Sequence, residues 1–89
     1  MERMNAGYVI VKAVKIECEE IVLGYKNNEW ATWRCEPQFN HYFWGHYFSS
    51  QANAQIDFYE RVKDLAETYI GVAKRDKLEK EHGNANNET

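Results

Sequence analysis

The side chains with the most chemical potential in this sequence are Cys35, His41 and His46, which lie within twelve residues of one another. Thiolate and imidazole are both zinc ligands. In a strand, however, a spacing of five residues places His41 and His46 on opposite faces, so the two rings do not converge on one ion. Cys35 and His41 together supply only two of the four ligands that a structural zinc site requires. We therefore predict no metal site and no bound cofactor.

The same cysteine and histidine could instead act as a nucleophilic pair. Such a pair needs a group that orients the base and a donor that stabilises the oxyanion, and the sequence nominates neither. Gly24 and Gly45 stand alone within apolar segments, which indicates close packing of a large ring, here Trp33, over the backbone rather than a phosphate loop. We predict no catalytic residue and a protein that is not an enzyme.

The two cysteines, Cys18 and Cys35, are too few for a disulfide framework, although a single disulfide across neighbouring strands is an alternative. The N-terminus has no apolar run behind a basic region and so does not resemble a signal peptide. The longest apolar stretch, residues 8–11, is too short to cross a membrane. These features predict a cytoplasmic protein with reduced thiols and no membrane partner.

The length of 89 residues allows one domain with a small core. The chain has 14 acidic and 11 basic side chains and a formal net charge of −3. This balance disfavours nucleic acid as a partner, because non-specific binding needs many Lys and Arg contacts with phosphates. It is compatible with a basic protein partner, including the basic groove of a nucleic-acid enzyme.

Four segments rich in β-branched and aromatic residues predict four strands. They cover residues 8–16, 21–26, 30–35 and 41–48. Asn27 and Asn28 favour a tight turn between the second and third segments. Pro37 separates the third segment from the fourth, because proline has no amide proton to donate to a ladder.

A helix is predicted after the last strand, because the apolar period changes from two to about 3.6. Ser49 or Ser50 can cap its first turn. Its apolar face consists of residues spaced four, three, four and three apart, namely Phe58, Val62, Leu65, Tyr69 and Val72. Gly71 weakens the helix, which is expected to end there or to continue frayed to residue 81.

Short connections favour antiparallel pairing of neighbouring strands. The predicted fold is α+β: a four-stranded antiparallel meander with one long C-terminal helix packed on one face, in the order β-β-β-β-α. Residues 1–7 are expected to form a flexible N-terminus, residues 8–81 a single α+β domain, and residues 82–89 a disordered tail.

Pairing across the turns predicts which side chains share a face of the sheet. The predicted pairs are Ile16 with Ile21, Lys26 with Trp30, and Cys35 with His41. The richer apolar face, expected to lie under the helix, contains Val14, Ile16, Ile21, Leu23, Tyr25, Ala31, Trp33, Phe43 and Tyr47. The opposite face contains Lys15, Val22, Lys26, Trp30, Thr32, Arg34, Tyr42, Trp44, His46 and Phe48.

This second face is expected to be exposed, because a single helix covers only one side of a sheet. Exposed aromatic patches mark interaction sites, and Trp, Tyr and Arg dominate binding hot spots. The predicted partner-binding residues are Trp30, Arg34, Tyr42, Trp44, His46 and Phe48.

Residues 21–25, 30–35, 42–48 and 57–61 together resemble short proteins of unassigned role that are carried by phages and conjugative elements of Gram-positive bacteria. The most specific part is Tyr-Phe-Trp-Gly-His-Tyr-Phe at positions 42–48. The resemblance carries no catalytic residue. It implies a mobile-element accessory protein, a class in which some members inhibit host defence systems such as CRISPR nucleases.

The sequence thus predicts a non-enzymatic binding protein whose aromatic sheet face contacts a host defence nuclease, in the manner of an anti-CRISPR inhibitor. Two alternatives stay open. Two such faces can pack together in a homodimer, or the aromatic face can stack single-stranded bases. The second alternative has a sparse basic lining of Lys15, Lys26 and Arg34.

Overall fold

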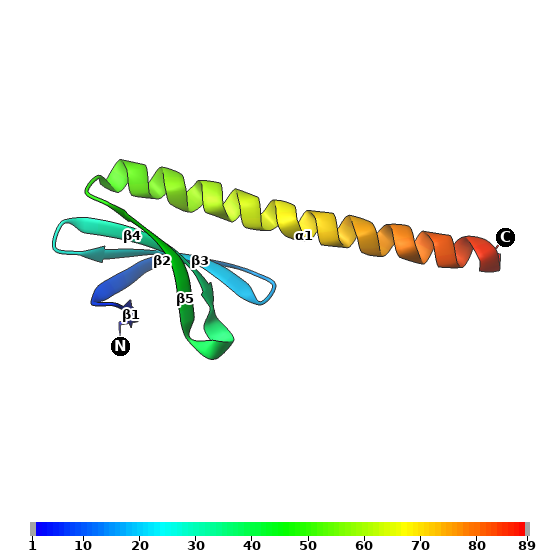
Figure 1. Ribbon diagram of the computed structural model, residues 1–89, viewed down its shortest axis with the longest axis horizontal. Helices are drawn as coiled ribbons and strands as arrows, with labels where there is room; N and C mark the ends of the chain where they lie inside the picture. Colours follow the sequence, from blue (N-terminus) through cyan, green and yellow to red (C-terminus); the bar gives the residue numbers. More distant parts are fainter. Residues whose placement is uncertain (1, 89) are drawn as a thin grey trace.

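In the computed structural model, five antiparallel strands form one sheet and a single long helix follows them (Figure 1). The structure describes residues 2–88, with side chains as far as residue 81. The elements are β1 (Met4–Asn5), β2 (Tyr8–Ile16), β3 (Glu19–Lys26), β4 (Glu29–Glu36), the 3₁₀ turn η1 (Pro37–Phe39), β5 (His41–Phe48) and α1 (Gln51–Glu88). The predicted α+β meander with a C-terminal helix is confirmed. The count of four strands is wrong, because β1 adds a fifth.

β1 lies in the segment predicted to be flexible. Ala6 and Gly7 have positive φ angles of 53° and 83° and return the chain onto β2. The Ile10 amide then donates to the Arg3 carbonyl at 2.8 Å. A strand of two residues carries no hydrophobic period, so the sequence pattern does not reveal it.

The β3–β4 hairpin turns at Asn27 and Asn28, whose φ angles are 48° and 65°. Positive φ at both central residues is typical of a type I′ turn, which makes a two-residue hairpin loop. The turn sets Lys26 opposite Glu29, so the predicted pairing of Lys26 with Trp30 is wrong by one residue. A shift of one residue moves every side chain of β4 to the other face.

The other two predicted registers are also wrong. The observed pairs are Ile16 with Glu19 and Glu36 with His41, in place of Ile16 with Ile21 and Cys35 with His41. The first shift is of two residues and leaves the faces of β2 unchanged. In β5 a bulge opposite Trp33 takes up an extra residue. Before the bulge Phe43 keeps its predicted facing, and after it the facing of β5 is reversed.

One hydrophobic cluster lies between the sheet and α1. Its buried members are Ile21, Leu23, Ala54, Phe58 and Leu65, and Val14, Ile16, Trp30, Phe48, Val62 and Tyr69 pack around them. The predicted apolar face of the helix is confirmed from Phe58 to Tyr69, whereas Val72 is exposed.

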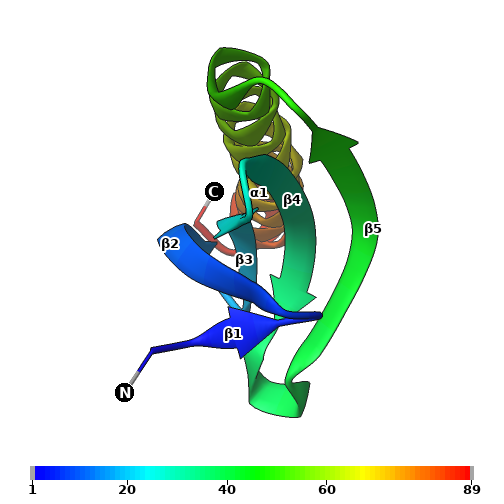
Figure 2. The same cartoon turned by 90° about the vertical axis from the view of Figure 1, so that its left-hand side faces the viewer.

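A second cluster fills the other face of the sheet, which curls around it (Figure 2). Its buried members are Tyr8, Val22, Ala31, Trp33 and Cys35. Trp33 occupies the space between Gly24 and Gly45, as predicted: a Cβ atom at Gly45 would lie 2.7 Å from Trp33 Nε1. The prediction of an open aromatic face on this side is therefore wrong, because the curvature of the sheet buries the side chains that β4 places there.

Arg3 closes one side of the curl. Its Nε donates to the Tyr42 hydroxyl at 2.8 Å, and its Nη2 donates to Glu20 Oε1 at 2.6 Å. The bond with Glu20 raises the pKa of the Arg3 guanidinium. The N-terminal segment thus links β3 to β5.

α1 begins after Ser50, whose Oγ accepts a hydrogen bond from the Asn53 amide at 3.2 Å, as the capping prediction requires. The helix does not end at Gly71 but continues, and every side chain from residue 70 to residue 81 is exposed. We call residues 70–81 the overhang; Figure 1 shows α1 projecting beyond the sheet. The predicted disordered tail, residues 82–89, lies outside the residues whose side chains are described. No helix in the described part of the chain is long and apolar enough to cross a membrane.

Candidate functional site

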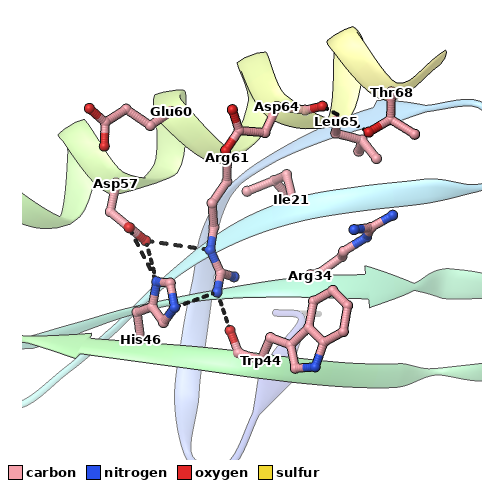
Figure 3. A pocket seen from close by; sticks show the side chains of 10 residues that line it. All are labelled: Ile21, Arg34, Trp44, His46, Asp57, Glu60, Arg61, Asp64, Leu65 and Thr68. Atoms are coloured by element: carbon pink, nitrogen blue, oxygen red, sulfur yellow. Dashed lines mark hydrogen bonds and ion pairs between the residues drawn. The ribbon is translucent and has the colours of Figure 1, made fainter. Parts of the chain in front are cut away.

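A cleft of about 310 Å³ opens between α1 and the strands β4 and β5 (Figure 3). Its lining residues are Ile21, Arg34, Trp44, His46, Asp57, Glu60, Arg61, Asp64, Leu65 and Thr68. The β5 bulge brings Trp44 to the mouth, and one side of α1 supplies the acidic residues and Arg61. We call this space the Trp44 cleft.

Asp57 is the centre of the polar network in the Trp44 cleft. Its Oδ2 accepts a hydrogen bond from the buried Thr32 hydroxyl at 2.6 Å and lies 3.0 Å from His46 Nδ1. Arg61 Nε lies 3.6 Å from the same oxygen, one helical turn away. The Asp57–Arg61 pair therefore belongs to a network between the helix and the sheet.

Arg61 crosses the cleft and reaches β5. Its Nη2 donates to the Trp44 carbonyl oxygen and lies 3.0 Å from His46 Nε2. Because Nε2 faces a guanidinium donor, the imidazole carries its proton on Nδ1, which donates to Asp57. Burial lowers the pKa of Arg61, the Asp57 carboxylate opposes that effect, and the positive charge of Arg34 adds to it.

One atom of this network is left without a partner. Arg61 Nη1 is buried and, among the residues that the structure describes, has no hydrogen-bond acceptor. A buried donor without an acceptor is costly. The unpaired donor is therefore a cost of placing Arg61 between α1 and β5.

The network does not form a nucleophilic triad. An Asp–His pair in a hydrolase holds a nucleophile at the free ring nitrogen, and here His46 Nε2 faces Arg61 instead. Among the residues that the structure describes, no hydroxyl or thiol is hydrogen-bonded to His46.

Trp44 combines two unusual properties. Its backbone has a φ of 55°, in the left-handed region that a bulky residue rarely adopts. Its side chain is 66% exposed. The guanidinium carbon of Arg34 lies 5.4 Å from the ring centroid, and Arg34 is itself held by Glu19, to which its Nε donates at 3.0 Å.

The rim of the Trp44 cleft carries negative charge. Arg34 pairs with Glu19 and Arg61 pairs with Asp57. Glu60 and Asp64 stand exposed on the same side of α1, and neither carboxylate has an ion-pair partner within residues 2–81. The cleft therefore offers two free carboxylates beside an exposed indole ring.

The structure brings together three of the six predicted partner-binding residues, Arg34, Trp44 and His46. Trp30 and Phe48 lie on the same side of the sheet but pack against the cluster under α1. Tyr42 lies on the opposite face, against Trp33 and Arg3. The six residues thus do not form one surface.

The residues considered for metal or thiol chemistry are dispersed. His41 pairs with Glu36 at 3.0 Å. Cys35 is buried, Cys18 is exposed, and both thiols are free, so the alternative of a cross-strand disulfide is wrong for this structure. The described part of the chain holds no group of three or more metal-binding side chains.

The residues that α1 contributes to the site were not predicted from the sequence. Asp57, Arg61 and Asp64 flank the buried stripe of α1, at positions beside Phe58 and Leu65. Polar residues directly beside an apolar stripe lie at the edge of the helix–sheet interface. That position is the signal that could have identified them.

Large exposed side chains also gather along η1 and β5, which is an edge strand of the sheet. Phe39, Trp44 and Tyr47 are each more than 60% exposed.

Comparison of the chain with protein-family models, with curated proteins and with solved structures gave no match.

Proposed function

We propose that this protein is a non-enzymatic binding protein that recognises a protein partner through the Trp44 cleft. The observation that carries the proposal is Trp44 itself, an exposed indole held on a left-handed backbone. Strain of this kind persists where the surrounding structure enforces it, and it clusters at binding sites. An exposed ring contributes little to the core, so the fold alone does not explain its presence.

The chemistry of the cleft favours a basic segment of the partner. A Lys or Arg side chain can pair with the free carboxylates of Glu60 and Asp64. Trp44 then covers the segment and excludes water, as hot-spot aromatics do.

A host defence nuclease is the partner class that we propose, with this protein acting as its inhibitor. Such enzymes carry basic grooves for nucleic acid, and a net charge of −3 with carboxylates at the cleft complements them. The resemblance of positions 42–48 to mobile-element proteins supports the same partner class.

Capture from a lysate of a Gram-positive bacterium that carries a CRISPR nuclease tests the proposal. The baits are the wild type, Trp44→Gly, and Leu78→Ala, which alters a similarly exposed side chain on the overhang. We expect the wild type and Leu78→Ala to capture the nuclease, and Trp44→Gly to lose at least about tenfold in recovery. Equal recovery by all three would show that the Trp44 cleft is not the contact.

The purified nuclease then tests the partner class separately. We expect the wild type to slow target cleavage and Trp44→Gly to leave it unchanged. If recovery depends on Trp44 but the captured protein is not a nuclease, the result supports the proposed binding site and shows that the proposed partner class is wrong.

A further inference from the structure

A second stripe, apolar apart from two lysines, runs along the flank of α1 on the β2 side of its buried face, where the Tyr59 hydroxyl accepts a hydrogen bond from Lys12 Nζ at 2.8 Å. It consists of Ala52, Ile56, Tyr59, Lys63, Ala66, Ile70, Ala73 and Lys77, which we call the seam. The spacing alternates between four and three over 26 residues, which is the heptad repeat of a coiled coil. Ile56, Tyr59 and Ile70 are each more than half exposed. We propose that the seam pairs in an antiparallel manner with the seam of a second copy of this chain.

The overhang is the first reason to expect a partner. Residues 70–81 have no contact with either hydrophobic cluster and all their side chains are exposed. Helical segments of about a dozen residues are marginal in water without tertiary packing. The seam continues along the overhang through Ile70, Ala73 and Lys77, so the apolar face that could stabilise this segment is already present.

In an antiparallel pair, each overhang packs against the part of the other copy's α1 that is fixed to its sheet. If the two-fold axis passes between the levels of Lys63 and Ala66, the overhang of one copy lies along the first turns of α1 in the other. Those turns are anchored to the sheet through Ala54 and Phe58, which are fully buried. Each copy thereby supplies the support that the other lacks.

The side-chain sizes also fit this arrangement. Opposing layers bring Ala52 to Lys77, Ile56 to Ala73, Tyr59 to Ile70 and Lys63 to Ala66 of the second copy. Three of these four layers set a long side chain against an alanine, which lets two helices approach closely. Parallel pairing would instead face Lys63 with Lys63 and Lys77 with Lys77, which is unfavourable.

The charges along α1 favour the same direction. Residues 51–69 hold four acidic and two basic side chains, whereas residues 70–81 hold three acidic and four basic side chains. Antiparallel pairing sets the acidic half of each helix beside the basic half of the other. Lys63 also comes within reach of Glu67 of the second copy, next to Ala66.

This inference does not rest on the proposed function. The polar network of the Trp44 cleft extends from Asp57 and Arg61 on a different side of α1. A dimer formed through the seam leaves Trp44 accessible and gives each assembly two clefts.

Light scattering during size exclusion tests the pairing, with the full chain at the highest concentration at which it stays in solution. We expect a mass of twice 10.5 kDa for the wild type. Ile70→Asp should give a single-chain mass, whereas Leu78→Asp, on the overhang but outside the seam, should stay dimeric. Both variants should retain the wild-type circular dichroism of the sheet domain, because neither residue belongs to a core cluster. A wild type of single-chain mass, or equal behaviour of the two variants, would overturn the proposal.

The direction of pairing is measured with a spin label at Lys77→Cys in a Cys18→Ser background. Antiparallel pairing separates the two labelled positions by about 37 Å along the helices, at 1.5 Å per residue over 25 residues. Parallel pairing brings them within about 10 Å, the distance between packed helix axes. A short distance in a dimeric sample would contradict the antiparallel arrangement. Loss of nuclease capture by Trp44→Gly with an unchanged dimer would separate the two proposals.

Discussion

At the scale of single residues, Trp44 shows a conflict between local backbone preference and side-chain placement. The left-handed conformation costs an L-residue roughly 1–2 kcal/mol. The contact with Arg34 returns about 0.5–1 kcal/mol at an exposed site, and the edge-to-face contact with Phe43, with ring centroids 4.9 Å apart, returns about 0.5–1.5 kcal/mol. These contacts offset the strain without a clear surplus, so stability alone does not select tryptophan over glycine, which is common at bulges. The indole is therefore explained better by a contact outside the chain.

Replacing Trp44 by glycine should separate stability from binding. Because glycine relieves the backbone strain, we expect the free energy of unfolding of Trp44→Gly to stay within about 1 kcal/mol of the wild type or to rise. Urea denaturation measures this. A loss of about 3 kcal/mol or more, typical of a core aromatic residue, would assign Trp44 to the core instead.

Thr32 tests the polar network from the sheet side. Its buried hydroxyl donates to Asp57 at 2.6 Å, and Thr32→Val leaves that carboxylate oxygen without this donor. We expect a loss of about 1–3 kcal/mol in the free energy of unfolding. Thr68→Val, at an exposed helix position that donates to the Asp64 carbonyl, is the control and should change stability by less than about 0.5 kcal/mol. Equal effects would show that the Thr32–Asp57 bond does not stabilise the fold.

The two cysteines should differ in reactivity. Burial raises the pKa of the Cys35 thiol, so less of the reactive thiolate forms, and the side chain is inaccessible. We expect iodoacetamide at about pH 8 to alkylate Cys18 in the folded protein and to leave Cys35 intact until denaturant is added. Mass spectrometry of the peptides measures both sites, and similar rates in the folded state would contradict the buried position of Cys35.

At the scale of elements, the sequence was sufficient for the type and order of the main segments. β-branched runs predicted β2–β5, and the spacing from Phe58 to Tyr69 predicted the buried face of α1. Turn chemistry was harder, because Asn27–Asn28–Glu29 is compatible with loops of two or three residues. The turn that forms is the two-residue type I′ turn, and it places the side chains of β4 on the faces opposite to those predicted. The bulge at Trp44 then reversed the end of β5, and nothing in the sequence period marks it.

The glycines of β5 and α1 should respond in opposite ways to the same substitution. A Cβ at Gly71 meets no atom within 4 Å, so Gly71→Ala should raise helix stability by about 1 kcal/mol. A Cβ at Gly45 would collide with Trp33, so Gly45→Ala should lower stability by about 1–3 kcal/mol. Thermal unfolding followed by circular dichroism measures both variants. An unchanged or raised stability of Gly45→Ala would contradict the packing of Trp33.

At the scale of the whole molecule, the curl of the sheet decides which surfaces are free. A flat sheet with one helix would leave a broad aromatic face exposed. Instead Tyr8 approaches Tyr47, with ring centroids 6.1 Å apart, and Arg3 reaches Tyr42. The inner part of that face is therefore filled, and Tyr47 stays exposed at its edge. Such closure depends on contacts between the ends of the sheet, and a pattern read along one strand does not contain them. The candidate site consequently moves to the edge of β5, where only part of the predicted set gathers.

The central claim is that the Trp44 cleft is in direct contact with a protein partner, and site-specific photo-cross-linking in host cells tests it. An aromatic photo-cross-linker replaces Trp44 in one sample and Val11, exposed on β2, in the control. We predict one covalent adduct of defined mass from position 44, containing the captured nuclease, and none from position 11. Adducts from position 11 alone, or none from position 44 under conditions in which the wild type captures its partner, would contradict the account.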